Sequence, residues 1–263
     1  MGYKVDYHIH SWCSDGTMKP TELVRKYHEE GYDIISITDH DGIDGIAEAL
    51  IAGEALKIQV VTGVELAVDF EGINLHLLGY QFDHENEALQ EKMKELRVYR
   101  DERNEKILAA LQAMGLDITM EDVKQRKGQK FIGKPNFARA LVAKGYVGSV
   151  KEAFEPGKFL NAPEIRAIER KKMTAEEAIA LMKQAGGMAV LAHPAKIKKI
   201  GERGSEEYWN NLDQMLRSLK KMGLKGLECI YPEHTEEEQL KFVVLAGKYH
   251  LHITEGSDFH GDE

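Results

Sequence analysis

The sequence carries a pair of metal-binding residue types near each of its two ends. His8 and His10 flank Ile9, and Asp258 and His260 flank Phe259. Because side chains two positions apart on a β-strand face the same way, each pair can present two ligands on one side of a strand. We therefore expect a closed fold in which the first and last strands meet over a metal site.

Apolar, β-branched runs alternate with amphipathic stretches in both the first and the last third of the chain. The predicted strands are 3–10, 34–38, 59–65, 75–80, 188–192, 226–230 and 252–255, and the predicted helices are 20–30, 44–56, 174–185, 206–221 and 235–249. Thr235 and Glu238 have the spacing of a capping box, which marks the start of the last helix. The alternation indicates an α/β fold, and 263 residues, of which 43% are hydrophobic, suffice for a single barrel.

The alternation stops between about residues 85 and 163. This region predicts one long charged helix through Leu111, then short helical pieces and no strand. We interpret residues 85–163 as a helical insertion, and residues 1–84 and 164–263 as the two parts of one barrel. An insertion above the C-terminal face would cap the face on which barrel enzymes carry out their chemistry.

Composition and charge argue against several kinds of partner. No apolar segment reaches the ~20 residues that span a bilayer, and the N-terminus lacks a signal-peptide pattern. Cys13 and Cys229 form neither a disulfide framework nor a paired metal-ligand spacing, which fits a reducing compartment. The formal net charge of -9 argues against duplex DNA, whose binding depends on surface Lys and Arg. We expect a cytoplasmic protein without a membrane or duplex DNA partner, and the sequence gives no signal for the oligomeric state.

Residues of metal-ligand type gather where the predicted strands end. The candidates are His8, His10, Asp15, His40, Glu65, His76, His193, Asp258 and His260. One such histidine is more often an ordinary buried residue, but nine candidates are hard to explain by packing, because buried ionisable groups are costly unless paired or metal-bound. Imidazole and carboxylate suit Zn, Mn and Fe. Asp39 and Asp41 are expected to orient ligands or turns rather than to bind metal.

Seven short motifs carry these candidates. They are Tyr7-His8-Ile9-His10-Ser11, Ser14-Asp15-Gly16, Ile37-Thr38-Asp39-His40, Gly63-Val64-Glu65, residues 76–80, Ala192-His193-Pro194 and residues 256–261. Together they resemble the motifs of the PHP (polymerase and histidinol phosphatase) family. The resemblance implies a distorted (β/α)7 TIM-like barrel with three divalent metal ions. It further implies that the first ion is held by His8, His10, Glu65 and Asp258, the second by Glu65, His76 and His193, and the third by Asp15, His40 and His260.

Within that family the chain is similar to the subgroup with a helical insertion after the His76 strand, which contains nucleotide 3',5'-bisphosphate phosphatases and 5'-3' exoribonucleases. That subgroup is expected to have Arg-Pro-His in the insertion and an Arg after the His-Pro, where this chain has Lys134-Pro135-Asn136 and Lys196. Lysine keeps the charge but loses the bidentate fork that grips phosphate. We expect Lys134 and Lys196 to orient the substrate phosphate, with Arg139 as a weaker candidate that could instead face the core of the insertion. His234 could donate a proton or contact the substrate, or it could simply end its loop before the helix.

The implied reaction is hydrolysis of a phosphate monoester of a small nucleotide by a metal-activated hydroxide, with Glu65, His193 and Asp258 as catalytic residues. Three divalent ions would carry more positive charge than the Asp15, Glu65 and Asp258 carboxylates carry negative charge. The resulting excess of positive charge suits an anionic substrate.

Several alternatives stay open. One is a 5'-3' exoribonuclease on short RNA, for which the basic run 124–130 would be a strand path, and another is a histidinol-phosphate-type phosphatase. An amidohydrolase-type enzyme is disfavoured because Glu65, and not a modified lysine, takes the bridging position. A metal-binding regulatory domain without catalysis is disfavoured because all nine ligand positions are filled.

Overall fold

The computed structural model describes residues 2–126 and 129–261, and its centre is one curved sheet. Its strands are β1 (Val5–Ile9), β2 (Ile34–Ile37), β3 (Gln59–Phe70), β4 (Ile73–Tyr80), β6 (Met188–Leu191), β7 (Gly226–Ile230) and β8 (His252–Glu255). They lie side by side in the order β1-β2-β3-β4-β6-β7-β8. The two-residue strand β5 (Met173–Thr174) pairs with β3. The two ends of the sheet nearly close. The Asp258 N–H donates to the His8 carbonyl and the His10 N–H donates to the Phe259 carbonyl, both at 2.8 Å. The predicted α/β barrel is confirmed in a distorted form.

The distortion lies in β3 and β4, which form an antiparallel hairpin. The sequence predicted a strand ending at Glu65, but β3 continues to Phe70 and turns through Glu71 and Gly72. Both turn residues have positive φ, 52° and 80°, as a two-residue hairpin turn of the mirror-image type requires. Strand β4 is therefore antiparallel to both of its neighbours, β3 and β6, whereas the pairs β1/β2, β2/β3, β6/β7 and β7/β8 are parallel.

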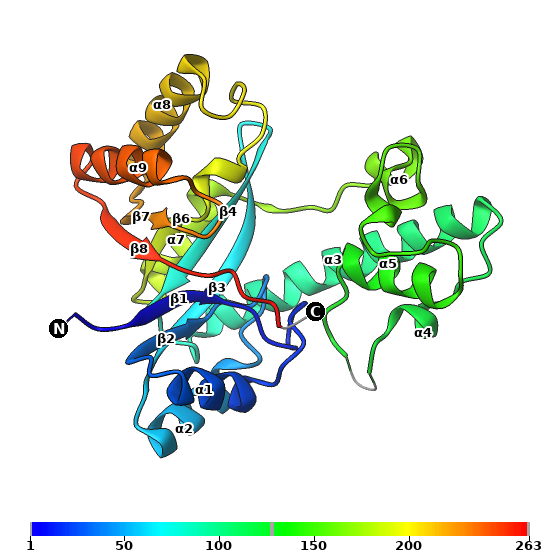
Figure 1. Cartoon of the computed structure of the whole chain (residues 1–263), viewed down its shortest axis with the longest axis horizontal. Helices are drawn as coiled ribbons and strands as arrows, with labels where there is room; N and C mark the ends of the chain where they lie inside the picture. Colours follow the sequence, from blue (N-terminus) through cyan, green and yellow to red (C-terminus); the bar gives the residue numbers. More distant parts are fainter. Residues whose placement is uncertain (1, 127–128, 262–263) are drawn as a thin grey trace.

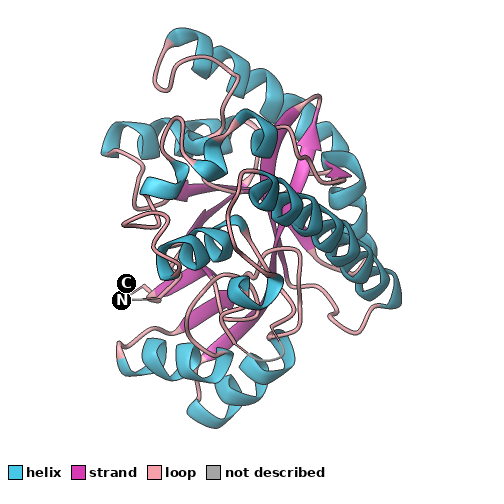
Figure 2. Cartoon of the chain, turned by 90° about the vertical axis from the view of Figure 1, so that its right-hand side faces the viewer, coloured by secondary structure: helices cyan, strands magenta, loops and turns pink. Residues whose placement is uncertain are grey.

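Helices surround the strands (Figure 2). They are α1 (Pro20–Glu29), α2 (Ile46–Leu56), α7 (Ala175–Gln184), α8 (Glu206–Met222) and α9 (Glu236–Lys248). Helix α9 begins with the predicted capping box: the Thr235 hydroxyl accepts from the Glu238 N–H at 3.2 Å, and the Glu238 carboxylate accepts from the Thr235 N–H at 2.8 Å. Strand residues such as Leu66 and Leu227 pack with Met182 of α7 and Leu216 of α8 in the largest hydrophobic cluster.

Residues 85–163 form helices and turns, and none of its described residues lies in a strand. The elements are α3 (Glu87–Ala113), α4 (Met120–Val123), α5 (Lys134–Ala143), the 3₁₀ turns η1 (Glu152–Phe154) and η2 (Phe159–Asn161), and the start of α6 (Pro163–Arg166). Helix α3 is 27 residues long and joins two hydrophobic clusters. Its first half places Leu89 and Leu96 in the barrel cluster, and its second half places Ile107 and Leu111 in a separate cluster with Phe137. Helices α4, α5 and α6 accordingly gather to one side of the barrel (Figure 1).

The first strand and the last segment are tied together by Asp6. Its carboxylate accepts from the His8 N–H at 3.1 Å, from the Ser257 N–H at 3.0 Å and from the Tyr27 hydroxyl at 2.9 Å. Burial raises the pKa of Asp6 above its ordinary value.

Among the described residues, no helix has the length and apolar character needed to cross a bilayer.

Candidate metal centre

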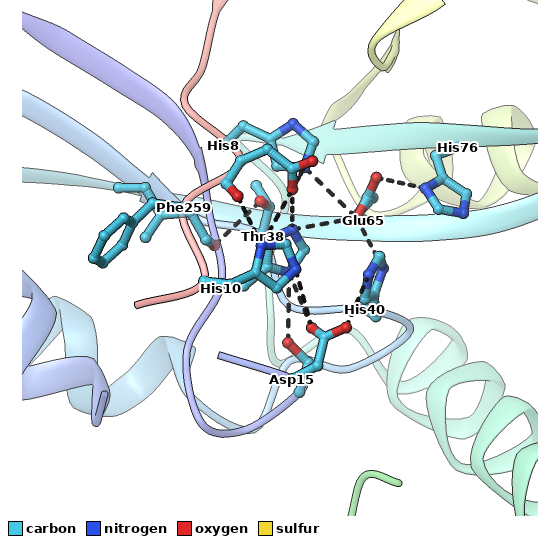
Figure 3. A network of polar contacts seen from close by, with 12 residues as sticks. His8, His10, Asp15, Thr38, His40, Glu65, His76 and Phe259 are labelled. Atoms are coloured by element: carbon cyan, nitrogen blue, oxygen red, sulfur yellow. Dashed lines mark hydrogen bonds and ion pairs between the residues drawn. The ribbon is translucent and has the colours of Figure 1, made fainter. Parts of the chain in front are cut away.

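The nine predicted ligands come together at one end of the barrel, in overlapping groups. Figure 3 labels His8, His10, Asp15, His40, Glu65 and His76. The groups are His10, Asp15, His40 and His260; His8, His10, Glu65 and Asp258; and His40, Glu65 and His76. Within each group the ligand atoms lie within 4.8 Å of one another. His193 joins them through its Nε2 atom, 3.0 Å from Glu65 Oε1. His10, His40 and Glu65 each belong to two groups, so the site is one continuous cluster.

Strand ends and unusual backbone conformations position these side chains. His8 lies in β1 and His10 follows it, while Glu65 in β3 and His76 in β4 are diagonal neighbours in contact across the hairpin. His193 has a φ of 24° and Asp258 a φ of 54°, both in the left-handed region that side chains other than glycine seldom adopt. Such backbone strain is concentrated at functional sites, where the surrounding structure enforces it.

Glu65 lies at the centre of the cluster. Its Oε1 atom lies 2.7 Å from His76 Nδ1, and its Oε2 atom lies 2.8 Å from His40 Nδ1 and 3.3 Å from His10 Nε2. Burial alone would raise the pKa of Glu65, but the surrounding histidines hold it well below its ordinary value. Glu65 is therefore a carboxylate near neutral pH, as a ligand must be.

The cluster fits metal ions by its unsatisfied atoms as well as by its residue types. Buried atoms of five predicted ligands make no hydrogen bond of acceptable geometry among the described residues, although other ligand atoms lie close to several of them: His8 Nε2, His10 Nε2, Asp15 Oδ1, Glu65 Oε2 and His193 Nδ1. Buried polar atoms are rarely left without a partner unless an ion or water completes them. A set of imidazole and carboxylate donors without thiolate suits Mn, Zn or Fe.

Glu228 in β7 orients two of the ligands and was not predicted. It is fully buried; its Oε1 atom lies 2.9 Å from His8 Nδ1, and its Oε2 atom accepts from the His193 N–H at 2.6 Å. Carboxylates that hold the second nitrogen of a ligating histidine fix the orientation of its ring. The signal in the sequence is a carboxylate within the otherwise apolar strand Gly-Leu-Glu-Cys-Ile.

Asp39 and Asp41 lie outside the ligand groups and support the loops that carry ligands. Asp39 accepts from the Ser11 N–H at 2.8 Å and from the Ser11 hydroxyl at 2.6 Å, which fixes the turn before Asp15. Asp41 accepts from the Ala67 N–H at 3.1 Å and from Arg170 at 2.6 Å. Burial would raise the pKa of Asp41, but its arginine partners lower it to about 2.

A cavity of about 450 Å³ opens over the cluster, with Lys196 in its wall. The Lys196 ammonium lies 3.2 Å from Asp258 Oδ2 and 3.1 Å from Glu233 Oε1. The Tyr231 hydroxyl donates to the same Asp258 oxygen at 2.8 Å. Lys196 thus places a positive charge in the wall of the cavity, beside the predicted metal ligands.

The other predicted substrate residues lie apart from this cavity. Lys134 begins α5 beside Arg103 and Arg166; burial, together with these arginines, lowers its pKa. Arg139 lines a second cavity of about 280 Å³, which also contains Trp12, Asp15 and Arg126.

His234 packs its ring 4.7 Å from that of Phe242, and its Nδ1 atom lies 3.0 Å from the Cys229 carbonyl oxygen. In the basic run 124–130, Lys124 pairs with Glu121 and Lys130 with Asp44, while residues 127–128 lie outside the described residues.

Comparisons with known proteins agree with this architecture. The family model described as "PHP domain" matches residues 6–229. A "5'-3' exoribonuclease" of Haemophilus influenzae is 28% identical to this chain over 99% of this chain and 91% of its own length. A "3',5'-nucleoside bisphosphate phosphatase" of Chromobacterium violaceum is 29% identical over 97% of this chain and 87% of its own length. A crystal structure from Bifidobacterium adolescentis, described as a metal-dependent phosphoesterase, superposes with a TM-score of 0.85 at 30% identity and covers 99% of this chain and 89% of that chain.

Proposed function

The chain belongs to the PHP domain family and is a metal-dependent phosphoesterase, and on this premise we propose that it removes a phosphate from a nucleoside 3',5'-bisphosphate. The observation that carries the proposal is the cavity of about 450 Å³ whose floor consists of predicted ligands and whose wall carries Lys196. That volume lies within the range of sites for small molecules. The similar phosphatase from Chromobacterium violaceum supports this substrate class.

We infer that three divalent ions, Mn, Zn or Fe, bind at the cluster. His8, His10, Glu65 and Asp258 would hold one, Glu65, His76 and His193 a second, and Asp15, His40 and His260 the third. The buried atoms of His8, His10, Asp15, Glu65 and His193 that make no well-directed hydrogen bond support the presence of ions at the cluster. The chemistry that such ions supply when bound is polarisation of phosphoryl oxygens and activation of water near neutral pH.

The protein's own side chains bind and orient the substrate in this proposal. Lys196 binds a phosphate oxygen, and its ion pairs with Asp258 and Glu233 keep the ammonium at the wall of the cavity. Tyr231 fixes the Asp258 carboxylate through its hydroxyl, and Glu228 fixes the His8 ring and the His193 backbone. Glu65, His193 and Asp258 would be the catalytic residues, because all three line the cavity in which the phosphate would lie. Residues 85–163 would act as a cap over this face.

A second candidate is 5'-3' exoribonuclease activity on short RNA. It is favoured by the second cavity, which meets the metal cluster at Asp15 and contains Trp12 and Arg126. The Arg126 guanidinium lies 4.9 Å from the Trp12 ring centroid. An aromatic ring beside a cation is the arrangement on which single-stranded nucleic acids stack their bases.

A substrate screen, carried out on protein whose metal content is known, separates the phosphatase from the exoribonuclease. Elemental analysis gives the number and identity of the metals. Phosphate release is measured from a nucleoside 3',5'-bisphosphate and from histidinol phosphate, and nucleotide release from a 5'-phosphorylated oligoribonucleotide. We expect the highest kcat/KM with the bisphosphate. A higher value with the oligoribonucleotide would favour the second candidate, and no turnover of any phosphate ester would support a regulatory metal-binding domain.

The His193→Ala substitution tests whether the turnover belongs to this cluster. It should lower kcat by at least about a hundredfold. Loss of a residue that only hydrogen-bonds to a metal ligand typically costs about 10–100-fold, and His193 is itself a predicted ligand. The exposed His28 on α1 offers the matched control, and His28→Ala should retain wild-type turnover. Wild-type rates in a folded His193→Ala variant, after metal removal and reloading, would contradict the assignment.

A further inference from the structure

Helix α9 presents apolar side chains on two opposite sides. On one side Phe242 and Ala246 are fully buried against the barrel. On the other side Leu240 and Val244 are 68% and 70% exposed. Leu240 is rotated by about 160° around the helix axis from Phe242, so it cannot reach the barrel core. A helix that covers a sheet needs only one apolar face, and the second is therefore not explained by the fold of a single chain.

Gly247 lies on the same outer side of α9, three positions after Val244 and seven after Leu240. It is exposed, and a β-carbon added to it would meet no heavy atom of the described structure within 4 Å. Glycine weakens a helix relative to alanine, so a helical glycine with free space around it calls for another reason. That reason can be the close approach of a second surface. We call Leu240, Val244 and Gly247 the outer stripe.

The outer stripe borders a part of the sheet that has no helix over it. Ile253 in β8 is paired in register with Leu227 in β7, and paired residues of adjacent strands point to the same face. Leu227 is fully buried, whereas Ile253 is 49% exposed. The helical layer thus stops at α9. Figure 1 shows α9 and β8 at the margin of the barrel, on the side away from α4, α5 and α6.

The charges around the outer stripe match those of a second α9. The first turn carries the exposed Glu236 and Glu237, and the last turn carries Lys248. Glu237 and Lys248 pair with Lys241 and Asp213 of their own chain, but their side chains are still 76% and 51% exposed. A matching surface needs a basic end and an acidic end in the opposite order. A second copy of α9, laid antiparallel, has that order.

We propose that two copies of this chain associate through the outer stripe, with their α9 helices antiparallel about a twofold axis near Val244. Leu240 of each copy then lies against Gly247 of the other, because these positions are nearly equidistant from Val244. The leucine fills the space that the glycine leaves, as a ridge fills a groove between packed helices. Such self-complementary contacts are the usual basis of dimers. An interface of one helix pair buries less than about 1,200 Å², so we expect a Kd on the order of 10 µM.

Sedimentation equilibrium of the full chain between about 1 and 200 µM tests this association. The wild-type mass should rise from 29.7 kDa toward twice that value. Val244→Glu should raise the Kd by about tenfold or more, because two carboxylates would meet at the axis. The matched control is Ile51→Glu on α2, where the side chain is 71% exposed, and it should keep the wild-type Kd.

Two further variants separate an interface from an effect on the fold. Gly247→Leu has room in the single chain and favours the helix, so the thermal midpoint of dilute protein should stay unchanged or rise. Its Kd should nevertheless increase by about tenfold or more, since the space for Leu240 is lost. Val244→Cys should form a covalent dimer on mild oxidation through the introduced thiols, whereas Ile51→Cys should not.

A wild-type chain that is still monomeric at about 200 µM would overturn the proposal. So would a dimer whose Kd stays within about twofold of wild type in both Val244→Glu and Gly247→Leu. A dimer that is not cross-linked in the Val244→Cys variant would overturn the antiparallel arrangement about Val244.

Discussion

At the scale of single residues, the metal centre depends on how its ligands are oriented as well as on which ligands are present. Glu228 holds His8 at 2.9 Å and the His193 N–H at 2.6 Å, and so sets the geometry on both sides of Glu65. It contacts neither the cavity nor a second carboxylate in the described structure. Its role can therefore be separated from substrate binding.

Glu228→Gln should weaken metal binding while the fold is retained. Glutamine has the same shape but loses the negative charge that favours the required His8 tautomer, and such changes typically cost about 10–100-fold in metal affinity. Competition with a chelator, followed by elemental analysis, measures the loss. Glu255→Gln, in the neighbouring strand β8, is the control and should bind metal like the wild type. Equal affinity in the Glu228→Gln variant would contradict the orienting role.

The residues of the candidate metal cluster could be picked out from the sequence because their signal is local. His8 and His10 occupy alternate positions of one predicted strand, and each of the other candidates lies in a short motif at or near the end of a predicted strand. Glu228, Arg100 and Arg170 were missed because their roles lie in contacts across long separations, such as the 129 positions between Asp41 and Arg170. A lone arginine in a charged helix has the same sequence pattern whether it faces solvent or a buried carboxylate.

At the scale of elements, β7 and β8 have the predicted boundaries, and the other predicted barrel helices and strands lie close to theirs, except at the hairpin. The predicted strand 59–65 ends where its alternation weakens, yet β3 runs on to Phe70 because β4 and β5 supply hydrogen-bonding partners. The partners of a strand are set by the tertiary fold, so its length could not be derived from its own residues.

The start of α9 predicts a dependence of stability on pH. Hydrogen bonds from Arg203 lower the pKa of Glu238 from 4.5 to about 2. Because the folded-state pKa lies below the unfolded-state value, the ion pair stabilises the protein above about pH 5, and this contribution is lost as the pH falls toward about 2.

Arg203→Met should therefore lower the free energy of unfolding by about 1 kcal/mol at pH 7, since the Arg203 side chain is 41% exposed and partly screened. The difference from wild type should shrink progressively below pH 5. Urea unfolding at several pH values measures it. Lys241→Met removes an exposed pair from the same helix and should have little effect at any pH. A difference that stays constant down to pH 3 would refute the ion-pair explanation.

At the scale of the whole molecule, α3 joins two hydrophobic clusters that share no buried side chain. We expect local unfolding of the second cluster, residues 107–165, to leave the barrel intact. Phe137 is fully buried there, and Phe137→Ala should cost that cluster about 3–5 kcal/mol. Hydrogen exchange should accelerate in α5 while β6 and β7 stay protected.

The matched control for this prediction is Phe242→Ala, which removes a fully buried phenylalanine from the barrel cluster. It should accelerate exchange in the barrel. If Phe137→Ala increases exchange equally in α5 and in the strands, the two clusters unfold as one unit and the division at residues 85–163 has no energetic meaning.

Closure of the barrel makes the last segment indispensable for the metal centre. A chain that ends at Glu255 loses Asp258, His260 and the hydrogen bonds of Ser257 and Asp258 to the first strand. It should keep its helical content, as measured by circular dichroism, but lose bound metal and at least about 99% of its turnover. A chain that ends at Gly261 retains every predicted ligand and should behave like the full chain. Metal binding by the shorter chain would show that the last segment is dispensable.

The same closure has a consequence during synthesis. Asp6 and Ser257, which are hydrogen-bonded in the folded protein, are separated by 251 positions in the chain. At about 5–20 residues per second, a ribosome needs tens of seconds between making the first and making the second. Throughout that interval the nascent chain carries an incomplete set of ligands. We therefore expect unfinished chains to be inactive, with activity beginning only when translation has delivered the last strand to the first.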